Sequence, residues 1–368
     1  MKISKLKVKT KNQTYNIIIG TNILINFLKI LQNNKINFNK CLFVIDKNIP
    51  KKILKKITLS LRKKKKFIYQ FNSSEVNKSQ KSINKILHIL LKNNFHRTDC
   101  LISIGGGITG DISSFSASIF KRGIKFINVP TTLLAQVDSS IGGKTGINSK
   151  YGKNLIGTFY QPELVVSDID FLKTLNRREI ICGYAEILKH ALIKNKKLFN
   201  YLDKNAHQIF KLKKPFIEKA IYESCLIKKK VVEKDEKEKN LRKILNFGHT
   251  FAHAYEAAKN YSKKLNHGEA VLLGIINASK FAYKNNYMNK KDYERILSHY
   301  NKLKLTIEIK NFFSRKDTNK ILSFMQKDKK NHNNKINLIL LKKIGNAVHS
   351  LQFSRKKIYK FIKKELIY

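Results

Sequence analysis

The first half of the chain alternates short apolar runs with segments of helical periodicity. Residues 41–46 and 100–104 are continuous apolar runs, which are typical of parallel strands buried on both faces. The expected strands are 3–8, 15–19, 41–46, 67–71, 100–104 and 125–129, and the expected helices are 21–31, with Thr21-Asn22 as its cap, and 78–93. Strands separated by helices predict an α/β, Rossmann-like, doubly wound parallel sheet, which binds ligands at the carboxyl ends of its strands.

The pattern becomes mostly helical in the second half of the chain. The expected elements there are helices from 177 to near 326, short strands at 336–341 and 347–351, and a basic amphipathic helix that closes the chain. We therefore predict an α/β domain over residues 1–175 and a mostly α-helical domain over residues 176–368. The active site is expected between the two domains.

Three consecutive glycines follow the apolar run 100–104, in the stretch Gly105-Gly-Gly-Ile-Thr-Gly-Asp111. Glycine lets the backbone approach a ligand closely, and the following helix offers N–H groups and a positive dipole end to a phosphate. This stretch predicts a pyrophosphate site. Asp46, which ends the run 41–46, has two interpretations: its carboxylate binds a ribose hydroxyl, or it is a turn residue before Asn48 and Pro50.

Composition changes this picture little. The chain has 368 residues, of which 42% are hydrophobic, enough to form sizeable cores, and its formal net charge is +50. The basic residues are spread along the whole chain and do not form one patch with aromatic stacking partners. We interpret the charge as compositional drift and expect no nucleic-acid partner, although the charge should attract anionic small molecules.

The sequence carries no signal of export or membrane insertion. Its first residues lack an apolar h-region, and no uncharged apolar run is long enough to cross a bilayer. Four cysteines, Cys41, Cys100, Cys182 and Cys225, show no paired spacing and are expected to be reduced thiols. We expect a cytoplasmic protein with no membrane partner.

Chemistry-bearing residues of the second half form three clusters. Glu186 and Lys189 share a helix face at i, i+3, His249 and His253 share one at i, i+4, and His267-Gly-Glu269 is the third. Singly, such clusters are typical of solvated ion pairs and structural histidines. Together, a carboxylate and imidazoles predict an open zinc site that binds a substrate oxygen, and spacing alone favours His249 and His253 as its paired ligands.

Eight motifs occur in a fixed order that covers nearly the whole chain. They are Gly105-Gly-Gly-Ile-Thr-Gly-Asp111, Val129-Pro-Thr-Thr132, Asp138-Ser-Ser-Ile-Gly-Gly-Lys-Thr145, Gly152-Lys-Asn154, Gly183-Tyr-Ala-Glu186 with Lys189, Asn246-Phe-Gly-His-Thr250, His267-Gly-Glu-Ala270 and Asp328-Lys-Lys330. Together they resemble the 3-dehydroquinate synthase family of the sugar phosphate cyclase superfamily.

The resemblance implies an NAD-dependent and Zn²⁺- or Co²⁺-dependent enzyme, a homodimer that acts on a sugar phosphate. Its substrate would be 3-deoxy-D-arabino-heptulosonate 7-phosphate (DAHP), and its products 3-dehydroquinate and phosphate, the second step of the shikimate pathway. In that reaction NAD is reduced and regenerated within each turnover, phosphate is eliminated, and ring opening and an intramolecular aldol closure give the carbocycle.

Site residues follow from the resemblance position by position. The metal ligands would be Glu186, His249 and His267, which differs from the choice by spacing, and His253 would face the substrate instead. The NAD contacts would be Asp46, Ser73, Ser74, Glu75, Val76, Asn77, Lys78, Gly107, Ile108, Thr109, Gly110, Asp111, Thr131, Thr132, Lys144, Lys153, Phe171, Leu172, Lys173 and Thr174. The substrate contacts would be Asp138, Lys144, Asn154, Lys189, Lys228, Arg242, Asn246, His253, Lys329 or Lys330, and Arg122, which reaches the neighbouring subunit's site.

Two alternative enzymes stay open, namely another sugar phosphate cyclase and a glycerol-dehydrogenase-like, metal-dependent oxidoreductase. DAHP carries a carboxylate that sedoheptulose 7-phosphate and glucose 6-phosphate lack, and Lys144, Lys228 and Arg242 are the candidate cations for it. A glycerol-dehydrogenase-like enzyme would not need the lysine-rich phosphate pocket.

Overall fold

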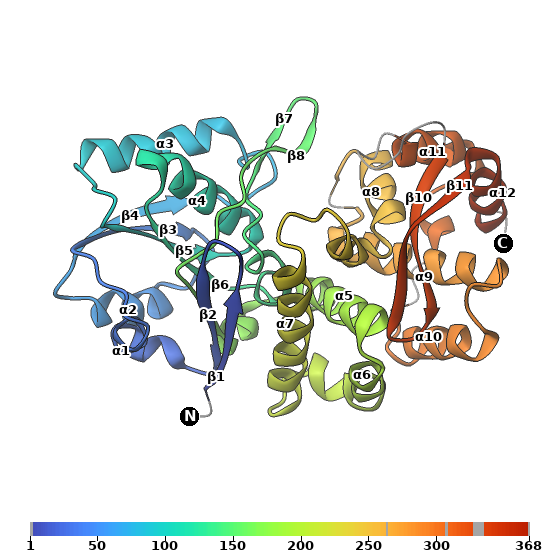
Figure 1. The fold of residues 1–368 in the computed structure, drawn as a ribbon, viewed down its shortest axis with the longest axis horizontal. Coiled ribbons are helices and arrows are strands. Elements are labelled where there is room, and N and C mark those ends of the chain that lie inside the picture. Colours follow the sequence, from blue (N-terminus) through green and yellow to red (C-terminus); the bar gives the residue numbers. More distant parts are fainter. Residues whose placement is uncertain (1–2, 263, 306–307, 327–334, 367–368) are drawn as a thin grey trace. The chain divides into compact units, whose positions relative to one another are not determined.

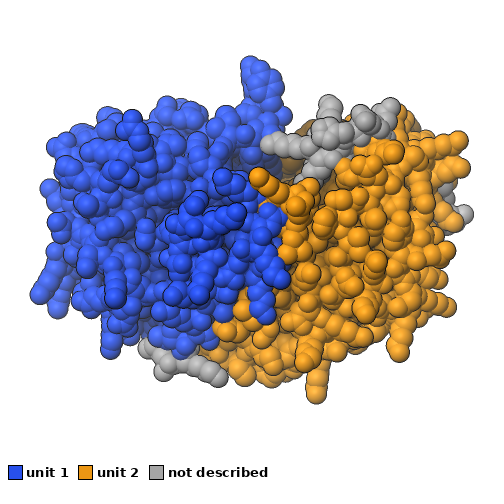
Figure 2. Space-filling model, in the orientation of Figure 1, with its two compact units in different colours: residues 1–176, 228–237 blue, residues 177–227, 238–368 orange. Residues whose placement is uncertain are grey.

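The structure, a computed structural model, describes residues 3–262, 264–305, 308–326 and 335–366. The chain forms two compact units, coloured separately in Figure 2. Unit 1 consists of Met1–Asn176 and Lys228–Lys237, and unit 2 consists of Arg177–Ile227 and Glu238–Tyr368. The sequence predicts one boundary at 175/176, whereas ten residues from the second half of the chain belong to unit 1.

Unit 1 is built on a seven-stranded sheet in the order β1-β2-β9-β6-β5-β3-β4. The strands are β1 (Ser4–Lys9), β2 (Thr14–Gly20), β3 (Lys40–Asp46), β4 (Lys65–Phe71), β5 (Cys100–Gly105), β6 (Lys125–Pro130) and β9 (Leu164–Asp168). Strand β1 pairs with β2 in the antiparallel sense, and all other neighbours are parallel. The predicted fold class is therefore confirmed, with β1 as an antiparallel edge strand and β9 as a strand that was not expected.

Helices cover both faces of this sheet (Figure 1). They are α1 (Phe27–Asn33) and α2 (Lys51–Ser60) on one face and α3 (Gln80–Lys92) and α4 (Gly107–Ile119) on the other. In β3, Phe43 and Ile45 pack with the first pair of helices, whereas Leu42 and Val44 pack with the second. Because side chains alternate along a strand, a strand covered on both faces needs the uninterrupted apolar run observed in the sequence.

The predicted cap of the first helix is wrong. Residues Ile23–Asn26 form a 3₁₀ turn before α1, and Asn22 adopts a left-handed φ of 53° without a capping side-chain hydrogen bond. The carboxylate of Asp168, at the end of β9, accepts the N–H groups of Asn22 (2.9 Å) and Leu24 (3.2 Å) instead. Burial raises the pKa of Asp168, and these backbone hydrogen bonds oppose the rise. The helix start is therefore satisfied from a distant strand.

A short hairpin that the sequence did not predict projects from unit 1 (Figure 1). It consists of β7 (Ile147–Ser149) and β8 (Gly152–Ile156), which pair in the antiparallel sense. Tyr151 lies between the two strands with 81% of its surface exposed. The hairpin carries Lys153 and Asn154, two of the residues expected to bind cofactor or substrate.

Unit 2 is mostly helical, as predicted. Its helices are α5 (Arg177–Lys194), α6 (Lys196–Phe210), the first part of α7 (Phe216–Lys234), α8 (His249–Ala258), α9 (His267–Lys284), α10 (Lys290–Lys302), α11 (Thr318–Gln326) and α12 (Arg355–Glu365). The expected strand pair is present as β10 (Lys335–Lys343) and β11 (Asn346–Ser354). Among the residues that the structure describes, no helix is both long and apolar enough to span a bilayer.

Glycines set how closely α5, α8 and α9 approach one another. A Cβ added to Gly274 in α9 would lie 2.1 Å from the carbonyl oxygen of Gly248, just before α8. A Cβ added to Gly268, at the start of α9, would lie 2.2 Å from the Cα of Cys182 in α5. The helices that carry Glu186, His249 and His267 are therefore in backbone contact at these glycines.

Gly274→Ala is expected to destabilise unit 2. The added methyl group meets backbone atoms of Gly248 and Ala252, and overpacking of this kind costs about 1–3 kcal/mol. Thermal unfolding followed by circular dichroism should show a Tm that falls by about 2–4 °C for each kcal/mol lost in a unit of this size.

Lys291→Ala is the control, because Lys291 is an exposed residue of α10 in the same unit. Surface substitutions of this kind change stability by about 0.5 kcal/mol or less, so this variant should unfold within about 2 °C of the unchanged protein. Equal losses in the two variants would contradict the packing argument.

Candidate active site

The glycine-rich junction between β5 and α4 brings predicted cofactor residues to the carboxyl edge of the sheet. Gly106 is the N-cap of α4 and offers no capping side chain to the first-turn N–H groups. The junction is tight: a Cβ added to Gly105 would lie 2.6 Å from Thr109, and one added to Gly107 would lie 3.0 Å from Ser139. Such a junction presents backbone N–H groups and a positive helix end to an anion.

A buried lysine connects two further predicted residues. Lys78 has 5% of its surface exposed, and its Nζ lies 2.5 Å from both Asp111 Oδ2 and Asn154 Oδ1. Burial raises the pKa of Asp111, although the ammonium of Lys78 acts to lower it. Glu75 contacts the Nζ of Lys153 at 3.3 Å. The loop after β4, the start of α4 and the β7–β8 hairpin therefore form one polar cluster.

Other predicted cofactor residues have local structural contacts in unit 1. Asp46 accepts the backbone N–H of Asn48 at 3.0 Å, as the turn interpretation expects, so a ribose contact stays a prediction. The side chains of Phe171 and Leu172 are buried, with that of Phe171 in the sheet's core. Val76, in contrast, is 86% exposed.

Asp138 and Lys228, two predicted substrate residues, form an ion pair in unit 1. The Nζ of Lys228 donates to Asp138 Oδ1 at 2.5 Å and to its carbonyl oxygen at 2.7 Å, and Lys228 is only 6% exposed. Lys144 is exposed beside Phe159, with which its backbone forms an isolated bridge. Arg122 adopts a left-handed φ of 63° between α4 and β6.

Unit 2 brings Glu186, His249 and His267 together from three helices. Glu186 Oε1 lies 3.6 Å from His249 Nε2 and 3.9 Å from His267 Nε2, and one ligand atom from each residue lies within 4.8 Å of the other two. Glu186 is fully buried and also forms an ion pair with Lys189, which is 2% exposed. Two ligands of a tetrahedral zinc ion, each about 2 Å from it, are separated by roughly 3.3 Å, so this donor set needs little adjustment.

Hydrogen bonds orient both imidazoles toward Glu186. His249 Nδ1 lies 3.2 Å from the carbonyl oxygen of Phe247, and His267 Nδ1 lies 3.1 Å from Glu256 Oε2. These acceptors favour the tautomer with the proton on Nδ1 and the Nε2 lone pair toward the carboxylate. Burial lowers the pKa of His249 well below its usual range, and Lys189 and the neighbouring histidines lower it further. A neutral imidazole is the form that binds a metal ion.

The observed group contains the three ligands implied by the resemblance and not His253. The ring of His253 packs edge-on against that of His249, with centroids 5.3 Å apart, and its side chain is exposed. A carboxylate and two imidazoles at these distances fit a divalent cation such as Zn²⁺ or Co²⁺.

The remaining predicted substrate residues have different surroundings. Arg242 is 2% exposed, and Asn246 Nδ2 donates to Glu238 Oε1 at 2.5 Å. Lys329 and Lys330 lie outside the described residues, so their role stays a prediction.

A chain of buried hydrogen bonds fixes α5 against two other helices of unit 2. The hydroxyl of Tyr184 lies 2.8 Å from His299 Nε2, and His299 Nδ1 lies 3.1 Å from Asp203 Oδ1. Burial lowers the pKa of His299, while Asp203 acts to raise it. This chain of contacts links α5, the helix that carries Glu186, to α10 and α6.

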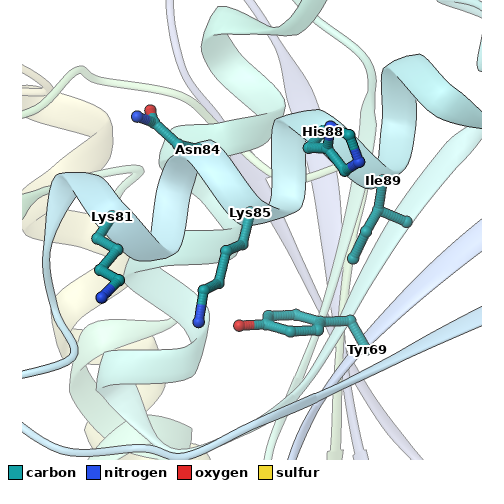
Figure 3. A pocket seen from close by; sticks show the side chains of 6 residues that line it. All are labelled: Tyr69, Lys81, Asn84, Lys85, His88 and Ile89. Atoms are coloured by element: carbon teal, nitrogen blue, oxygen red, sulfur yellow. The ribbon is translucent and has the colours of Figure 1, made fainter.

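An open pocket of about 760 Å³ lies apart from these residues, between α3 and the edge strand β4 (Figure 3). It is lined by Tyr69, Lys81, Asn84, Lys85, His88 and Ile89. None of these residues was predicted to bind cofactor, metal or substrate, and the pocket is not part of the candidate site.

Comparisons with known proteins agree with this geometry. The chain matches the 3-dehydroquinate synthase N-terminal family model over residues 68–182 and the 3-dehydroquinate synthase C-terminal model over residues 183–331. A 3-dehydroquinate synthase of Pelagibacter ubique (strain HTCC1062) is 62% identical over 366 residues, which cover 100% of both chains. The chain belongs to the 3-dehydroquinate synthase family.

A more distant member and a solved structure extend this family assignment. The 3-dehydroquinate synthase of Dictyoglomus thermophilum is 41% identical over 361 residues, or 98% of both chains. The crystal structure of 2-deoxy-scyllo-inosose synthase complexed with carbaglucose-6-phosphate, NAD⁺ and Co²⁺ has a TM-score of 0.87 at 25% identity, and covers 98% of this chain and 100% of that chain. The resemblance inferred from the eight motifs is confirmed.

Sequence reasoning missed three polar residues that contact predicted site residues in the structure. Glu256 contacts His267, Glu238 contacts Asn246, and Asn148 contacts Glu75. Glu256 had a detectable signal, because it lies seven residues after His249, two turns along the same helix face. The other two contacts join distant segments, and spacing within one segment could not reveal them.

Glu256→Gln is expected to weaken metal binding. The carboxylate accepts a hydrogen bond from His267 Nδ1 and makes that imidazole a better ligand, and loss of such a partner typically costs about 10- to 100-fold in affinity. Competition with a chromophoric chelator, for Zn²⁺ and for Co²⁺, measures the change.

Glu294→Gln serves as the control, because Glu294 is an exposed residue of α10 that pairs with Lys290. This variant should bind the metal ion as tightly as the unchanged protein does. If Glu256→Gln also keeps it, the role assigned to Glu256 is wrong.

Proposed function

We propose that this protein is an NAD- and metal-dependent phosphorus-oxygen lyase that converts DAHP to 3-dehydroquinate and phosphate, in the shikimate pathway to chorismate and the aromatic amino acids. The observation that carries the proposal is its 62% identity, over the whole length of both chains, to a 3-dehydroquinate synthase. The two family models and the arrangement of chemical groups in each unit support it.

The residues of unit 1 suit a dinucleotide. The N–H groups at the start of α4 would bind the pyrophosphate, and Glu75, Lys78, Asp111 and Lys153 would surround the rest of the cofactor. Bound NAD supplies a hydride acceptor that returns the hydride later in the same turnover. NAD⁺ is named in the complex of the related 2-deoxy-scyllo-inosose synthase.

Glu186, His249 and His267 would hold the divalent cation, Zn²⁺ or Co²⁺. When bound, the cation supplies a Lewis acid that acidifies a substrate hydroxyl near neutral pH. Lys189 balances the remaining charge of Glu186 and offers its ammonium to a substrate oxygen. Fixed hydrogen bonds from His249 and His267 to their acceptors keep the ligands oriented.

The substrate carries two anionic groups, and the proposed contacts divide between them. Asn154 and His253 would bind the phosphate together with lysines, for which compact cations and amide donors suffice. Arg242 would bind the carboxylate with its planar pair of N–H donors, together with Lys144 and Lys228. Asp138 already holds the Nζ of Lys228, so it would direct that ammonium toward the substrate.

The protein itself has little proton transfer to perform in this reaction. The departing phosphate, held by cations, can accept the proton that is released in its own elimination. The residues then serve to bind, orient and neutralise charge. We further propose a homodimer in which Arg122 reaches the neighbouring subunit's site, on the basis of the resemblance alone.

The first test follows phosphate release from DAHP. Activity should require both NAD and Zn²⁺ or Co²⁺, and a chelator should abolish it until metal is restored. Because product and substrate have the same overall oxidation level after phosphate loss, NADH absorbance should not accumulate during steady turnover.

Accumulation of NADH at the rate of phosphate release would contradict the cyclase and favour a dehydrogenase. The variant His267→Ala tests the metal requirement separately from NAD binding. It should lose metal binding and turnover but keep its affinity for NAD, because its contacts lie in unit 2 and the proposed NAD residues lie in unit 1.

A second test separates DAHP from sugar phosphates that lack a carboxylate. Arg242→Ala should lower kcat/KM for DAHP by orders of magnitude, and Arg242→Lys should restore little, since lysine cannot form the paired contact. A sugar phosphate without a carboxylate forgoes these charge-assisted hydrogen bonds, each worth about 1.5–3 kcal/mol, so the unchanged enzyme should strongly prefer DAHP to sedoheptulose 7-phosphate.

Arg295→Ala is the matched control, because Arg295 contacts Asn200 on the exposed surface of the same unit. Its steady-state kinetics with DAHP should be unchanged. Similar kcat/KM values for DAHP and sedoheptulose 7-phosphate in the unchanged enzyme would show that the carboxylate is not recognised.

A further inference from the structure

Asn148 connects the loop after β4 to the β7–β8 hairpin through its side-chain amide and its backbone N–H. Its Nδ2 donates to the carbonyl oxygen (3.0 Å) and to Oε2 (2.8 Å) of Glu75, and its backbone N–H donates to the carbonyl oxygen of Lys78 at 2.8 Å. Its Oδ1 accepts the backbone N–H of Asn154 at 3.1 Å. If the side-chain amide of Asn148 were flipped, its NH₂ group would face the N–H of Asn154, and two donors cannot form a hydrogen bond. These partners therefore define one orientation of the amide.

The two segments that Asn148 joins have different proposed ligands. Glu75 and Lys78 belong to the loop proposed to bind NAD, whereas Asn154 is proposed to contact the substrate phosphate. Lys78 reinforces the connection, because its Nζ donates to Asn154 Oδ1 at 2.5 Å, and Lys153 contacts Glu75 from the same hairpin. Lys78 of the cofactor loop therefore contacts the side chain of Asn154 directly, and Asn148 connects the same loop to the backbone N–H of Asn154.

The hydrogen bond from Asn154 to Asn148 also bears on the shape of the hairpin. Asn154 has a φ of 54°, in the left-handed region that non-glycine residues adopt at a cost. A hydrogen bond to its N–H favours this conformation, which in turn places the Asn154 side chain beside Lys78. A change in the position of Glu75 would be transmitted through one side chain to the backbone of Asn154.

We propose that Asn148 is a positioning residue that couples NAD binding to phosphate binding. The inference rests on the proposed function of the two segments. When NAD binds, it fixes the positions of Glu75 and Lys78. Asn148 then holds Asn154 in the conformation that binds phosphate, so the phosphate meets a preorganised contact. By thermodynamic reciprocity, phosphate must strengthen NAD binding by the same factor.

The experiment measures NAD affinity of the metal-loaded protein by isothermal titration calorimetry, without and with saturating inorganic phosphate. In the unchanged protein, phosphate should lower the Kd for NAD by about fivefold or more, the lower range of typical coupling. In Asn148→Ala, the ratio of the two Kd values should fall to near one. Thermal unfolding of each variant is recorded in parallel.

A second variant keeps the hairpin contact and removes the side-chain contact to the loop, while the backbone hydrogen bond to Lys78 stays. In Asn148→Asp, a carboxylate oxygen can still accept the N–H of Asn154, but no donor reaches Glu75, and two carboxylates face each other. This variant should bind NAD more weakly and lose the coupling while its hairpin stays folded. Tyr151→Ala, at the exposed turn of the same hairpin, is the matched control and should keep the full coupling.

Each outcome decides between the proposal and a merely structural role. A structural role lowers the Tm of Asn148→Ala and Asn148→Asp but leaves the ratio of Kd values unchanged, which overturns the proposal. A ratio of one in the unchanged protein overturns it as well, and leaves the proposed function intact if NAD binds. Absence of NAD binding to the unchanged protein would overturn the proposed function together with this inference.

Discussion

Three buried lysines, each paired with a carboxylate, are the electrostatic constraint around which the candidate site is arranged. Lys78, Lys189 and Lys228 are exposed by 5%, 2% and 6%, and they pair with Asp111, Glu186 and Asp138. Removing two charges from water costs several kcal/mol for each ion, and their attraction repays this only with good geometry. Such pairs contribute little to stability, so their presence at the carboxyl edge of the sheet and beside two histidines agrees with a role in binding.

Burial also separates these lysines from the rest of a very basic chain. The sequence has 75 Lys and Arg residues against 25 Asp and Glu residues, and most of the lysines are solvated. Net charge alone therefore pointed to no site. A lysine that is buried beside a carboxylate must be held there by packing of several elements, and only the folded structure reveals which lysines meet this condition.

Elements that have a clear local sequence pattern were predicted correctly. Features that depend on short segments or on contacts between distant residues were missed. The apolar runs at 41–46 and 100–104 gave β3 and β5 because a doubly covered strand must be apolar on both faces. The five-residue strand β9 and the β7–β8 hairpin were missed, since short segments carry little periodic signal. The local sequence around Thr21 and Asn22 could not predict the cap supplied by Asp168, because Asp168 lies 146 residues after Asn22.

The same distinction applies to the site. Spacing identified His249 and His253 as neighbours on one helix face, and their rings do pack together. It could not show that Glu186 lies near His249 and His267, because that depends on glycine contacts between α5, α8 and α9. Residue identities along eight motifs supplied this information through family resemblance, whereas Glu256 and Asn148 emerged only from hydrogen bonds in the structure.

The assignment of Lys228–Lys237 to unit 1 affects how the gene can be divided. Helix α7 begins in unit 2 and passes into unit 1 between Ile227 and Lys228, so the chain crosses between the units three times. A fragment that ends at Asn176 would separate Asp138 from Lys228 and Gln161 from Glu236. Neither unit is encoded by one continuous stretch, and a permuted or split version of this enzyme would have to carry those ten residues with its N-terminal part.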